Sequence, residues 1–365
     1  MSDFEFIQHA DALGPLEERL ARAEHVAVDT EFMREKTYYP RWCLTQIALP
    51  DGIVLIDVME PGVGEGLVAL LAQAPAVKVL HSARQDLEVF ALADAERPLV
   101  PLFDTQIAAA LVGFPDQVGY ANLVKKRLGV ELPKDSTRTD WSIRPLTERQ
   151  LAYAADDVRY LYELFPLMLD ELESRNRRAW AEEDCARMSE NFDIASVYAI
   201  EDAPARIKGK NRLNGRALLA ANRLAVWREQ AAQRSDRPRR WIMDDRDLTE
   251  AAIDMAEGRM RQNRRINALR EDFRADVERV AEAVLAVPAD QLPRVEDERV
   301  PTAEERRKVK QLAELVASRA SELGLDSAIL ARRRDLEAAV RGDFSGLCFS
   351  GWRDEEVGGR LRAVL

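Results

Sequence analysis

The sequence predicts an α/β domain followed by an all-α tail, and three observations support this. Short β-type runs alternate with helical segments up to about residue 170, which is typical of a mixed sheet covered by helices. Two early runs, 42–49 and 53–58, are joined by Pro50-Asp51-Gly52, and Asp-Gly between β-type runs is a strong hairpin signal. After these alternating segments the strand signals end, so we expect only helices in the rest of the chain.

The individual elements follow from the spacing of their apolar residues. Leucines at helical spacing predict a helix at 11–24, and the apolar run 25–31 predicts a short buried strand that ends in carboxylates. Together with the two runs above, this strand should open the sheet as three consecutive antiparallel strands. Gly129 suits the end of one helix and Thr147 suits the N-cap of another. The remaining expected elements are helices at 67–73, 83–93, 105–112, 120–128 and 147–169, a β-like run at 77–81 and an apolar run at 99–103.

The chain divides at two segments that have the composition of linkers. Residues 201–210 and 291–301 combine charged residues with proline. We therefore expect a first domain over 1–200, one small helical domain over 211–290 and a second over 302–365.

The two helical parts share a weak internal repeat. Arg246-Asp247-Leu248 precedes Ala251-Ala252, and Arg334-Asp335-Leu336 precedes Ala338-Ala339. In both places a long helical segment comes before the motif. Either the tail holds two small domains of one type, or two helices rich in Ala, Arg and Leu are similar by chance.

Composition places the chain in a broad class. The 365 residues are 47% hydrophobic and 32% charged, as expected for a soluble globular protein, and no apolar run is long enough to span a membrane. The N-terminus lacks the pattern of a signal peptide. Three scattered cysteines do not form a disulfide framework, so we expect a cytoplasmic protein. Three histidines and these cysteines make a zinc site improbable.

Charge is distributed unevenly along the chain. The net charge of −11 argues against wholesale electrostatic capture of nucleic acid. Residues 206–240, however, carry eleven Lys or Arg and only two acids. This basic segment is either a nucleic-acid-binding surface or a solvated helix face with a linker.

Two carboxylates end the first expected strand of the sheet. Asp29 and Glu31 are two residues apart, and residues i and i+2 of a strand point to the same face. Both should therefore point into one site, with Thr30 turned away. Taken alone, such a pair is also compatible with a solvated strand end.

Further acids follow at positions where they can join this pair. Asp86 comes soon after a β-like run, and ligand sites of α/β folds lie at the carboxyl ends of strands. Tyr153 and Asp157 are four residues apart and share a helix face. Asp29, Glu31, Asp86 and Asp157 are hard oxygen ligands, which suit two divalent cations, Mg²⁺ or Mn²⁺, in a phosphodiester-cleaving site. A tyrosine of ordinary pKa near 10 is suited to orienting the attacking water.

These acids lie within longer stretches that match a known pattern. The stretches are Val28-Asp29-Thr30-Glu31-Phe32, Tyr38-Tyr39-Pro40, His81-Ser82 to Asp86-Leu87-Glu88-Val89-Phe90, and Tyr153-Ala154-Ala155-Asp156-Asp157. They resemble the three exonuclease motifs of the DEDD superfamily, in its tyrosine-containing subgroup. Two further stretches, Phe103-Asp104-Thr105-Gln106 and Arg138-Thr139-Asp140-Trp141 with the Arg144-Pro145 that follows, resemble the bacterial ribonuclease D family in particular. The helical tail resembles the HRDC domain of that family.

The resemblance implies a ribonuclease-H-like fold followed by one or two HRDC-like domains, the second divergent. It also implies a metal-dependent 3′→5′ exoribonuclease that releases nucleoside 5′-monophosphates and matures tRNA precursors and other small structured RNAs. The partner would be RNA with a free 3′ end, and no obligatory protein partner is implied. By position, the metal ligands would be Asp29, Glu31, Asp86 and Asp157, with Tyr153 as a catalytic residue that orients water.

Other residues are candidates for holding the RNA 3′ end, because aromatic stacking and cations bind single strands without reading sequence. The substrate-binding candidates are Phe32, Arg34, Lys36, Tyr39, Lys134, Arg138 and Trp141. For the aromatic residues the alternative is core packing, and for the cations it is solvation. Gln46 and Asp104 could support the site or be structural, and His81 is expected to be a buried, hydrogen-bonded histidine.

Three other functions remain open from the residues alone. The acids do not distinguish RNA from DNA, so a 3′→5′ DNA exonuclease is compatible with them. A non-catalytic nucleic-acid-binding scaffold would depend on the helical tail, although the intact acid set argues against it. A glycosidase also uses two carboxylates but does not explain four acids and a tyrosine in this order.

Overall fold

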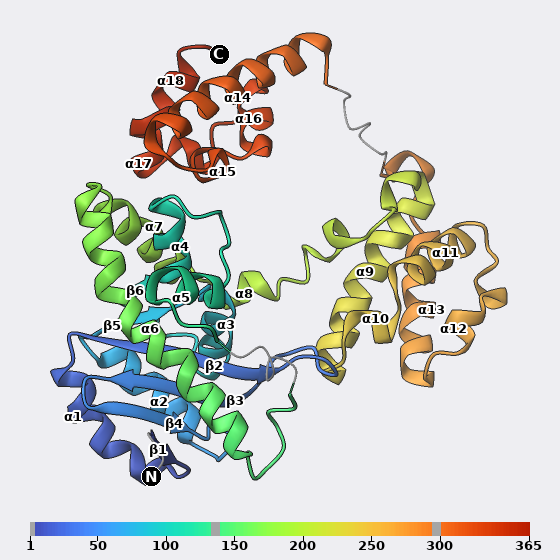
Figure 1. The fold of residues 1–365 in the computed structure, drawn as a ribbon. Coiled ribbons are helices and arrows are strands. Elements are labelled where there is room, and N and C mark those ends of the chain that lie inside the picture. Colours follow the sequence, from blue (N-terminus) through green and yellow to red (C-terminus); the bar gives the residue numbers. More distant parts are fainter. Residues whose placement is uncertain (1–3, 133–138, 294–300) are drawn as a thin grey trace. The chain divides into compact units, whose positions relative to one another are not determined.

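The computed structural model describes residues 4–132, 139–293 and 301–365, and the chain forms two compact units (Figure 1). The first unit comprises Met1–Phe32, Trp42–Ile194 and Pro301–Leu365. The second comprises Met33–Arg41 and Ala195–Val300. Within the described ranges, no helix is both long and apolar enough to cross a membrane.

The first unit contains a mixed six-stranded sheet, as expected, with strand order β1-β4-β3-β2-β5-β6. β3 and β4 form the expected hairpin, in which Leu49 pairs with Gly52; Gly52 has φ +147°, a conformation that side-chain-bearing residues rarely adopt. β1 was not expected, because four residues carry too little pattern; it pairs parallel with β4. The strands are β1 (Phe4–Ile7), β2 (His25–Met33), β3 (Arg41–Leu49), β4 (Gly52–Ile56), β5 (Val77–Leu80) and β6 (Leu102–Asp104).

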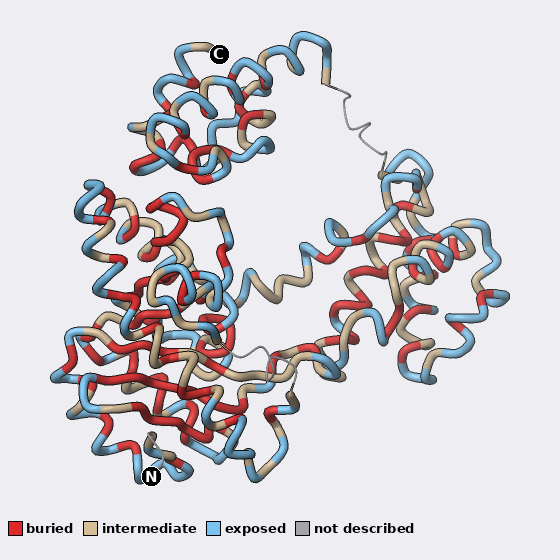
Figure 2. The backbone as a smooth tube through the Cα atoms, in the orientation of Figure 1, coloured by how far each residue is buried: buried red, intermediate tan, exposed pale blue. Residues whose placement is uncertain are grey.

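Helices cover both faces of this sheet. Val26 and Val28 of β2 belong to the apolar core that also contains residues of α1, α2 and α3, and Figure 2 shows buried residues along the strands. Ala27, between them, is fully buried outside that core, and α6 packs on β4 and β5. Odd-numbered residues of β2 from Ala27 onward therefore face α6, and even-numbered residues face α3. The helices are α1 (Gly14–Arg22), α2 (Val63–Gln73), α3 (Arg84–Ala93), α4 (Thr105–Leu111), α5 (Tyr120–Leu128), α6 (Glu148–Ser174) and α7 (Arg178–Glu190).

A hydrogen bond made possible by an internal proline joins helix α6 to the start of β2. Pro166 has no N–H, which leaves the carbonyl of Tyr162 without its usual helical donor. The ring of His25 hydrogen-bonds that carbonyl and stacks on the Tyr162 ring at 4.2 Å between centroids. At its N-terminus α6 has the expected Thr147 cap, and Gln150 completes a capping box. Two of the three elements that carry the predicted acids, β2 and α6, are thus held together at His25.

The second unit is helical, and its chain path differs from the expected one at residues 201–210. That segment is not a linker, because it contains a 3₁₀ turn, η2 (Ala203–Arg206), and places Ala203 and Ile207 in the core of the unit. Residues 236–238 separate α9 from α10. The helices of this unit are α9 (Gly215–Ser235), α10 (Arg239–Ile242), α11 (Asp245–Ala256), α12 (Arg264–Asn267) and α13 (Glu271–Leu285).

The segment between β2 and β3 belongs to the core of the second unit. Tyr38 is 4% exposed, and its hydroxyl contacts Glu229, Gln233 (3.2 Å) and Arg239 (3.1 Å). Glu229 is itself buried and pairs with Arg239 at 2.6 Å and with Arg206 at 3.5 Å. A buried carboxylate thus pairs with two partly exposed guanidinium groups at the edge of this core.

Residues 301–365 repeat the beginning of the second unit in element order and register. α9 begins at Gly215 and α14 (Ala303–Leu323) begins 88 residues later; the same offset relates the starts of α10 and α15 (Ser327–Leu330), and of α11 and α16 (Arg333–Val340). The buried residues of α14, Val309, Leu312, Val316 and Ala320, correspond to buried residues of α9. The repeat in the sequence therefore has a counterpart in the structure.

This second helical part packs on α7 and so belongs to the first unit. Arg353 binds Asp184 with two hydrogen bonds of 2.6 and 2.8 Å, and both side chains are less than 10% exposed. The ring of Trp352 stacks on Trp180 at 4.2 Å between centroids. Most of the expected linker 291–301 lies outside the described residues.

Replacing Glu229 by Gln should lower the free energy of unfolding of the second unit by about 1–3 kcal/mol, because Tyr38, Arg206 and Arg239 would lose a charged hydrogen-bond partner. Hydrogen exchange of the α9 amides measures this unit separately. As the matched control, Glu250→Gln removes the exposed partner of Arg246 and should change exchange little. Equal effects of the two variants would contradict the prediction.

Candidate active site

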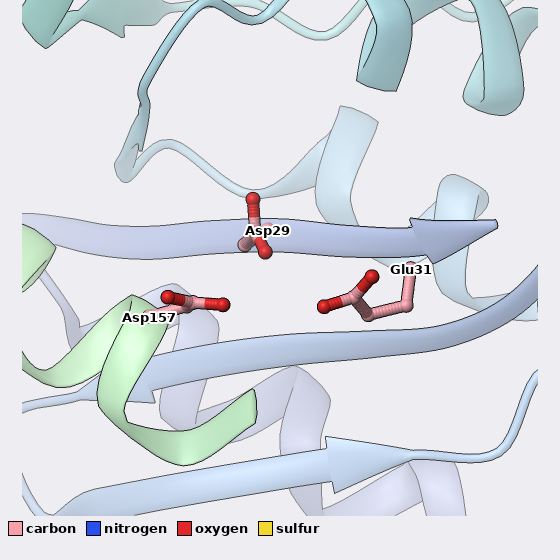
Figure 3. A group of neighbouring side chains, drawn as sticks. All are labelled: Asp29, Glu31 and Asp157. Atoms are coloured by element: carbon pink, nitrogen blue, oxygen red, sulfur yellow. The ribbon is translucent and has the colours of Figure 1, made fainter. Parts of the chain in front are cut away.

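Three carboxylates meet between β2 and α6. Asp29 and Glu31 extend from β2, and Asp157 extends from α6 (Figure 3). One ligand oxygen from each lies within 4.8 Å of the others, and Glu31 and Asp157 point toward one another. The alternation of β2 explains this, because its odd-numbered residues face α6.

Asp86 reaches the site from α3, on the other face of β2. Its carboxylate accepts a 2.5 Å hydrogen bond from the hydroxyl of Thr30, whose side chain lies on the α3 face. Asp86 is 7% exposed, and its negative charge acts on Glu31. Thr30 does turn away from Asp29 and Glu31, as expected. Its hydroxyl nevertheless contributes to the site, because it hydrogen-bonds the fourth acid, Asp86.

Burial raises the pKa of Asp29, Glu31 and Asp86 well above the usual carboxylate range, and the negative charges of neighbouring acids raise them further. Burial also raises the pKa of Asp157, to about 7. Among the described residues, no Lys or Arg forms an ion pair with any of these four acids. Within the described ranges, the site therefore holds several acids that no positive side chain balances.

This donor set fits divalent cations. Every ligand atom is a carboxylate oxygen, the type that Mg²⁺ and Mn²⁺ prefer, and the group contains neither His nor Cys. A bound cation would reverse the local electrostatics by stabilising the ionised acids. The uncompensated, buried carboxylates are the structural feature that such a cation would satisfy.

Tyr153 lies beside the acids, one helical turn before Asp157, and hydrogen-bonds its carboxylate. Burial raises the pKa of the Tyr153 phenol, and the charges of Asp157, Glu31 and Asp29 raise it further. The phenol therefore stays protonated at neutral pH and acts as a hydrogen-bond donor, in agreement with the orienting role expected from the sequence.

Comparisons with known proteins identify the family. Residues 4–173 match the family model described as 3'-5' exonuclease. The ribonuclease D of Jannaschia sp. (strain CCS1) is 36% identical, over 98% of this chain and 94% of that protein. The chain belongs to the ribonuclease D family.

Other members of the ribonuclease D family agree with this assignment. The ribonuclease D of Xanthomonas oryzae pv. oryzae is 36% identical, over 94% of both proteins. The crystal structure of Escherichia coli RNase D, described as an exoribonuclease involved in structured RNA processing, has a TM-score of 0.87 and 30% identity, and covers 100% of this chain and 99% of that chain. The activity of this chain is accordingly that of a 3′→5′ exoribonuclease.

Two residues for which the sequence predicted no role position α6. The hydroxyl of Tyr120 donates a 2.5 Å hydrogen bond to the backbone carbonyl of Asp157. In a regular helix that carbonyl would accept from the N–H of Leu161, and here this N–H bonds the Tyr120 hydroxyl. Arg144 binds both oxygens of Asp57 and the carbonyl of Trp141 (2.7 Å), which fixes the segment leading into α6. No local sequence signal marks the bond of Tyr120 to Asp157 or that of Arg144 to Asp57, because each joins residues distant in the chain.

Three residues considered from the sequence have clear structural roles. Gln46 donates a 3.5 Å hydrogen bond to Asp29, so it supports the site. Asp104 caps α4 and accepts from the amides of residues 82 and 83 in the turn before α3. His81 is satisfied by Thr105 and by the carbonyl of residue 118, as expected for a buried histidine.

The substrate-binding candidates separate into several groups. Trp141 is 3% exposed and packs near Tyr153, with ring centroids 6.1 Å apart, so the prediction that it stacks on a base is wrong for this structure. Phe32 is half-buried at the end of the first-unit part of β2. Arg34, Lys36 and Tyr39 lie in the segment that belongs to the second unit, where Tyr39 packs on Tyr38 and Tyr198. Lys134 and Arg138 lie outside the described residues.

Replacing Thr30 by Val keeps the side-chain shape but removes the donor to Asp86, so divalent cations should bind about 10- to 100-fold more weakly. Calorimetric titration with Mn²⁺ measures this without relying on activity. Thr249→Val makes the same exchange on α11 of the second unit, outside the acidic site, and serves as the control. Unchanged Mn²⁺ affinity in Thr30→Val would show that the hydroxyl does not position Asp86.

Cation affinity should rise with pH through about 7, the pKa of Asp157, because protons compete with the cation for the carboxylates. Below that pH the protonated acids would have to release protons on binding. Mn²⁺ titrations between about pH 5.5 and 8.5, in buffers of different ionisation enthalpy, measure affinity and proton release together. A constant affinity across this range would contradict the raised pKa values.

Proposed function

We propose that this chain removes nucleoside 5′-monophosphates one at a time from the 3′ end of tRNA precursors and other small structured RNAs, using two divalent cations, Mg²⁺ or Mn²⁺. The observation that supports this most directly is the group of Asp29, Glu31 and Asp157, with Asp86 beside it, inside a 3′→5′ exonuclease domain. The involvement of the E. coli relative in structured RNA processing supports the choice of substrate.

We assign the binding of the cations to Asp29, Glu31, Asp86 and Asp157. Cations held there would activate water and stabilise the negative charge that develops on the leaving 3′-oxygen. The carboxylates must be ionised for this, so their pKa values must fall when cations bind. Thr30 and Gln46 keep two of the four in place through their hydrogen bonds to Asp86 and Asp29.

We assign the orientation of the attacking water to Tyr153. Its protonated hydroxyl lies against Asp157, so it can donate to a water or to a phosphate oxygen that enters between the two groups. A phenol with a raised pKa is a poor base at neutral pH. Packing on the buried Trp141 limits the freedom of the Tyr153 ring.

The organisation of the tail and the compartment complete the proposal. We take 211–290 and 302–365 as two HRDC-like domains, the second divergent, which the constant offset of 88 residues between their helices supports.

We place the enzyme in the cytoplasm, because Cys43, Cys185 and Cys348 are all free and buried.

A time course with an RNA that carries a single-stranded 3′ tail and a 5′ label tests the proposal. With Mg²⁺ or Mn²⁺ we expect a ladder that shortens from the 3′ end, with no shortening in EDTA. Asp157→Ala should abolish the ladder, because the site loses one of its three grouped carboxylates. A matched DNA tail should be shortened more slowly, and faster removal of DNA would contradict the proposed substrate.

Two tyrosine variants make the same assay specific. Tyr153→Phe should slow shortening by about 100-fold while Mn²⁺ affinity is retained, because the phenol orients water and is not assigned as a ligand. Tyr160→Phe removes a hydroxyl from the same helix and should leave the rate unchanged. If wild type never shortens RNA with either cation, the nuclease assignment fails and a binding scaffold takes its place.

A further inference from the structure

The second unit contains a pocket that the exonuclease chemistry does not use. The pocket has a volume of about 190 Å³ and lies where α10 meets α12 and the start of α13. Trp241 of α10 lines it and is 55% exposed, an unusual state for the largest aromatic side chain. The basic lining residues are Arg237, Arg240, Arg265 and Arg270, and Asp247 is the acid among the lining residues.

Arg237 and Arg240 have guanidinium groups that are available to bind an anion. Within the described part of the chain, the guanidinium groups of Arg237 and Arg240 have no acidic partner, and both residues are exposed. Arg265 pairs with Asp247, and Arg270 pairs with Asp272 and lies over the Phe273 ring. The pocket therefore combines free positive charge with an open aromatic face.

Most of the remaining basic segment 206–240 is occupied within the unit itself. Arg206 and Arg239 bind Glu229, Arg228 binds Asp245, and Arg234 binds Asp276. Lys210 and Arg216 donate to backbone carbonyls. Lys208, Arg212 and Arg223 also have no acidic partner among the described residues, but none of them lines the pocket. The segment is therefore not one continuous nucleic-acid-binding stripe, and Arg237 and Arg240 are its unpaired charges at the pocket.

The internal repeat shows that the exposed tryptophan is not needed to build this kind of helix pair. At the offset of 88 residues, Trp241 corresponds to Ile329, which is 8% exposed, and Arg240 corresponds to Ala328. The next residue is buried in both copies, Ile242 in α10 and Leu330 in α15. The same short helix thus folds with an apolar pair in one copy and presents an Arg-Trp pair to solvent in the other.

We propose that this pocket binds one unpaired nucleotide of an RNA, with the base stacked on Trp241 and the adjoining phosphates on Arg237 and Arg240. Stacking on an exposed aromatic ring and guanidinium contacts to phosphate are the usual means of holding single-stranded RNA. The volume is below the ~300–1,000 Å³ of pockets for drug-sized ligands, so the pocket admits a base or a phosphate group and not a folded segment.

The chemistry of the lining favours RNA over an acidic peptide. Four guanidinium groups face one carboxylate, which selects a polyanion of either kind. Trp241, however, offers a flat apolar face beside that charge, and a nucleotide supplies a flat ring next to its phosphate. The inference rests on the proposed function for the identity of the ligand as RNA, and it adds a second binding surface outside the acidic site.

Binding of an unstructured, 5′-labelled RNA of about 12 nucleotides, within the ~4–16 nucleotides of known single-strand sites, tests this in the full-length chain. Fluorescence anisotropy is recorded in EDTA, so that cleavage plays no part. Trp241→Ala should weaken binding about 5- to 150-fold, the equivalent of removing one stacked base. Trp241→Phe should restore most of the affinity, because it restores an aromatic face.

The double variant Arg237→Gln with Arg240→Gln should reduce the slope of log Kd against log salt by about 0.7 for each phosphate that is no longer neutralised. Phe344→Ala, at an aromatic residue that is 42% exposed in the other helical part, and Arg246→Gln, at an exposed arginine, should change neither affinity nor slope. Circular dichroism melts confirm that each variant is folded.

Unchanged RNA affinity in a folded Trp241→Ala protein would overturn the inference. The inference would also fail if Trp241→Ala lowered the affinity for a labelled poly-glutamate peptide but not the affinity for RNA, because the pocket would then be a peptide site. Cleavage of a dinucleotide by wild type, with its single scissile bond, tests the nuclease separately. If that cleavage fails while Trp241→Ala still weakens RNA binding, the proposed function fails and the pocket remains an RNA site.

Discussion

Asp29, Glu31, Asp86 and Asp157 lie close together, with Asp86 buried and the other three half-buried. Among the described residues no cationic side chain pairs with them, so their charges repel one another. Without cations, the molecule can relieve this repulsion by keeping protons on the acids, which is what the raised pKa values express. A movement of β2 away from α6 would also relieve the repulsion between the carboxylates. The rest of the exonuclease domain depends on preventing that movement, because a cation site needs the carboxylates close together.

Contacts made outside the acids prevent it. His25, which lies four residues before Asp29 in β2, hydrogen-bonds the carbonyl of α6 that Pro166 leaves without a donor. Tyr120 bonds the backbone of Asp157 directly. On the other face of β2, Thr30 holds Asp86. Each contact uses a neutral hydrogen bond, so none of them neutralises the negative potential that attracts a divalent cation.

The helical tail shows how one small fold serves two purposes. In residues 301–365, Arg353 and Trp352 face α7 and are buried against Asp184 and Trp180. In the second unit, the equivalent of the buried Ile329 is the exposed Trp241. The shared apolar positions of α9 and α14 keep the fold in both copies, while the residues between them are free to differ.

The order and spacing of residues in the sequence determined the fold class, the β3–β4 hairpin, the N-cap at Thr147 and the alternation that directs Asp29 and Glu31 to one face, because these depend on neighbours within a few residues. The short β1, the packing of Tyr38 beside Glu229 and the roles of Thr30, Tyr120 and Arg144 were decided only by the tertiary structure. Each of these contacts joins residues 37 or more positions apart, and no local pattern encodes such a pairing. Burial of Trp141 follows the same rule: an aromatic residue in a polar loop gives the same sequence pattern whether its ring packs inside or stacks on a base, and only the chain around it decides.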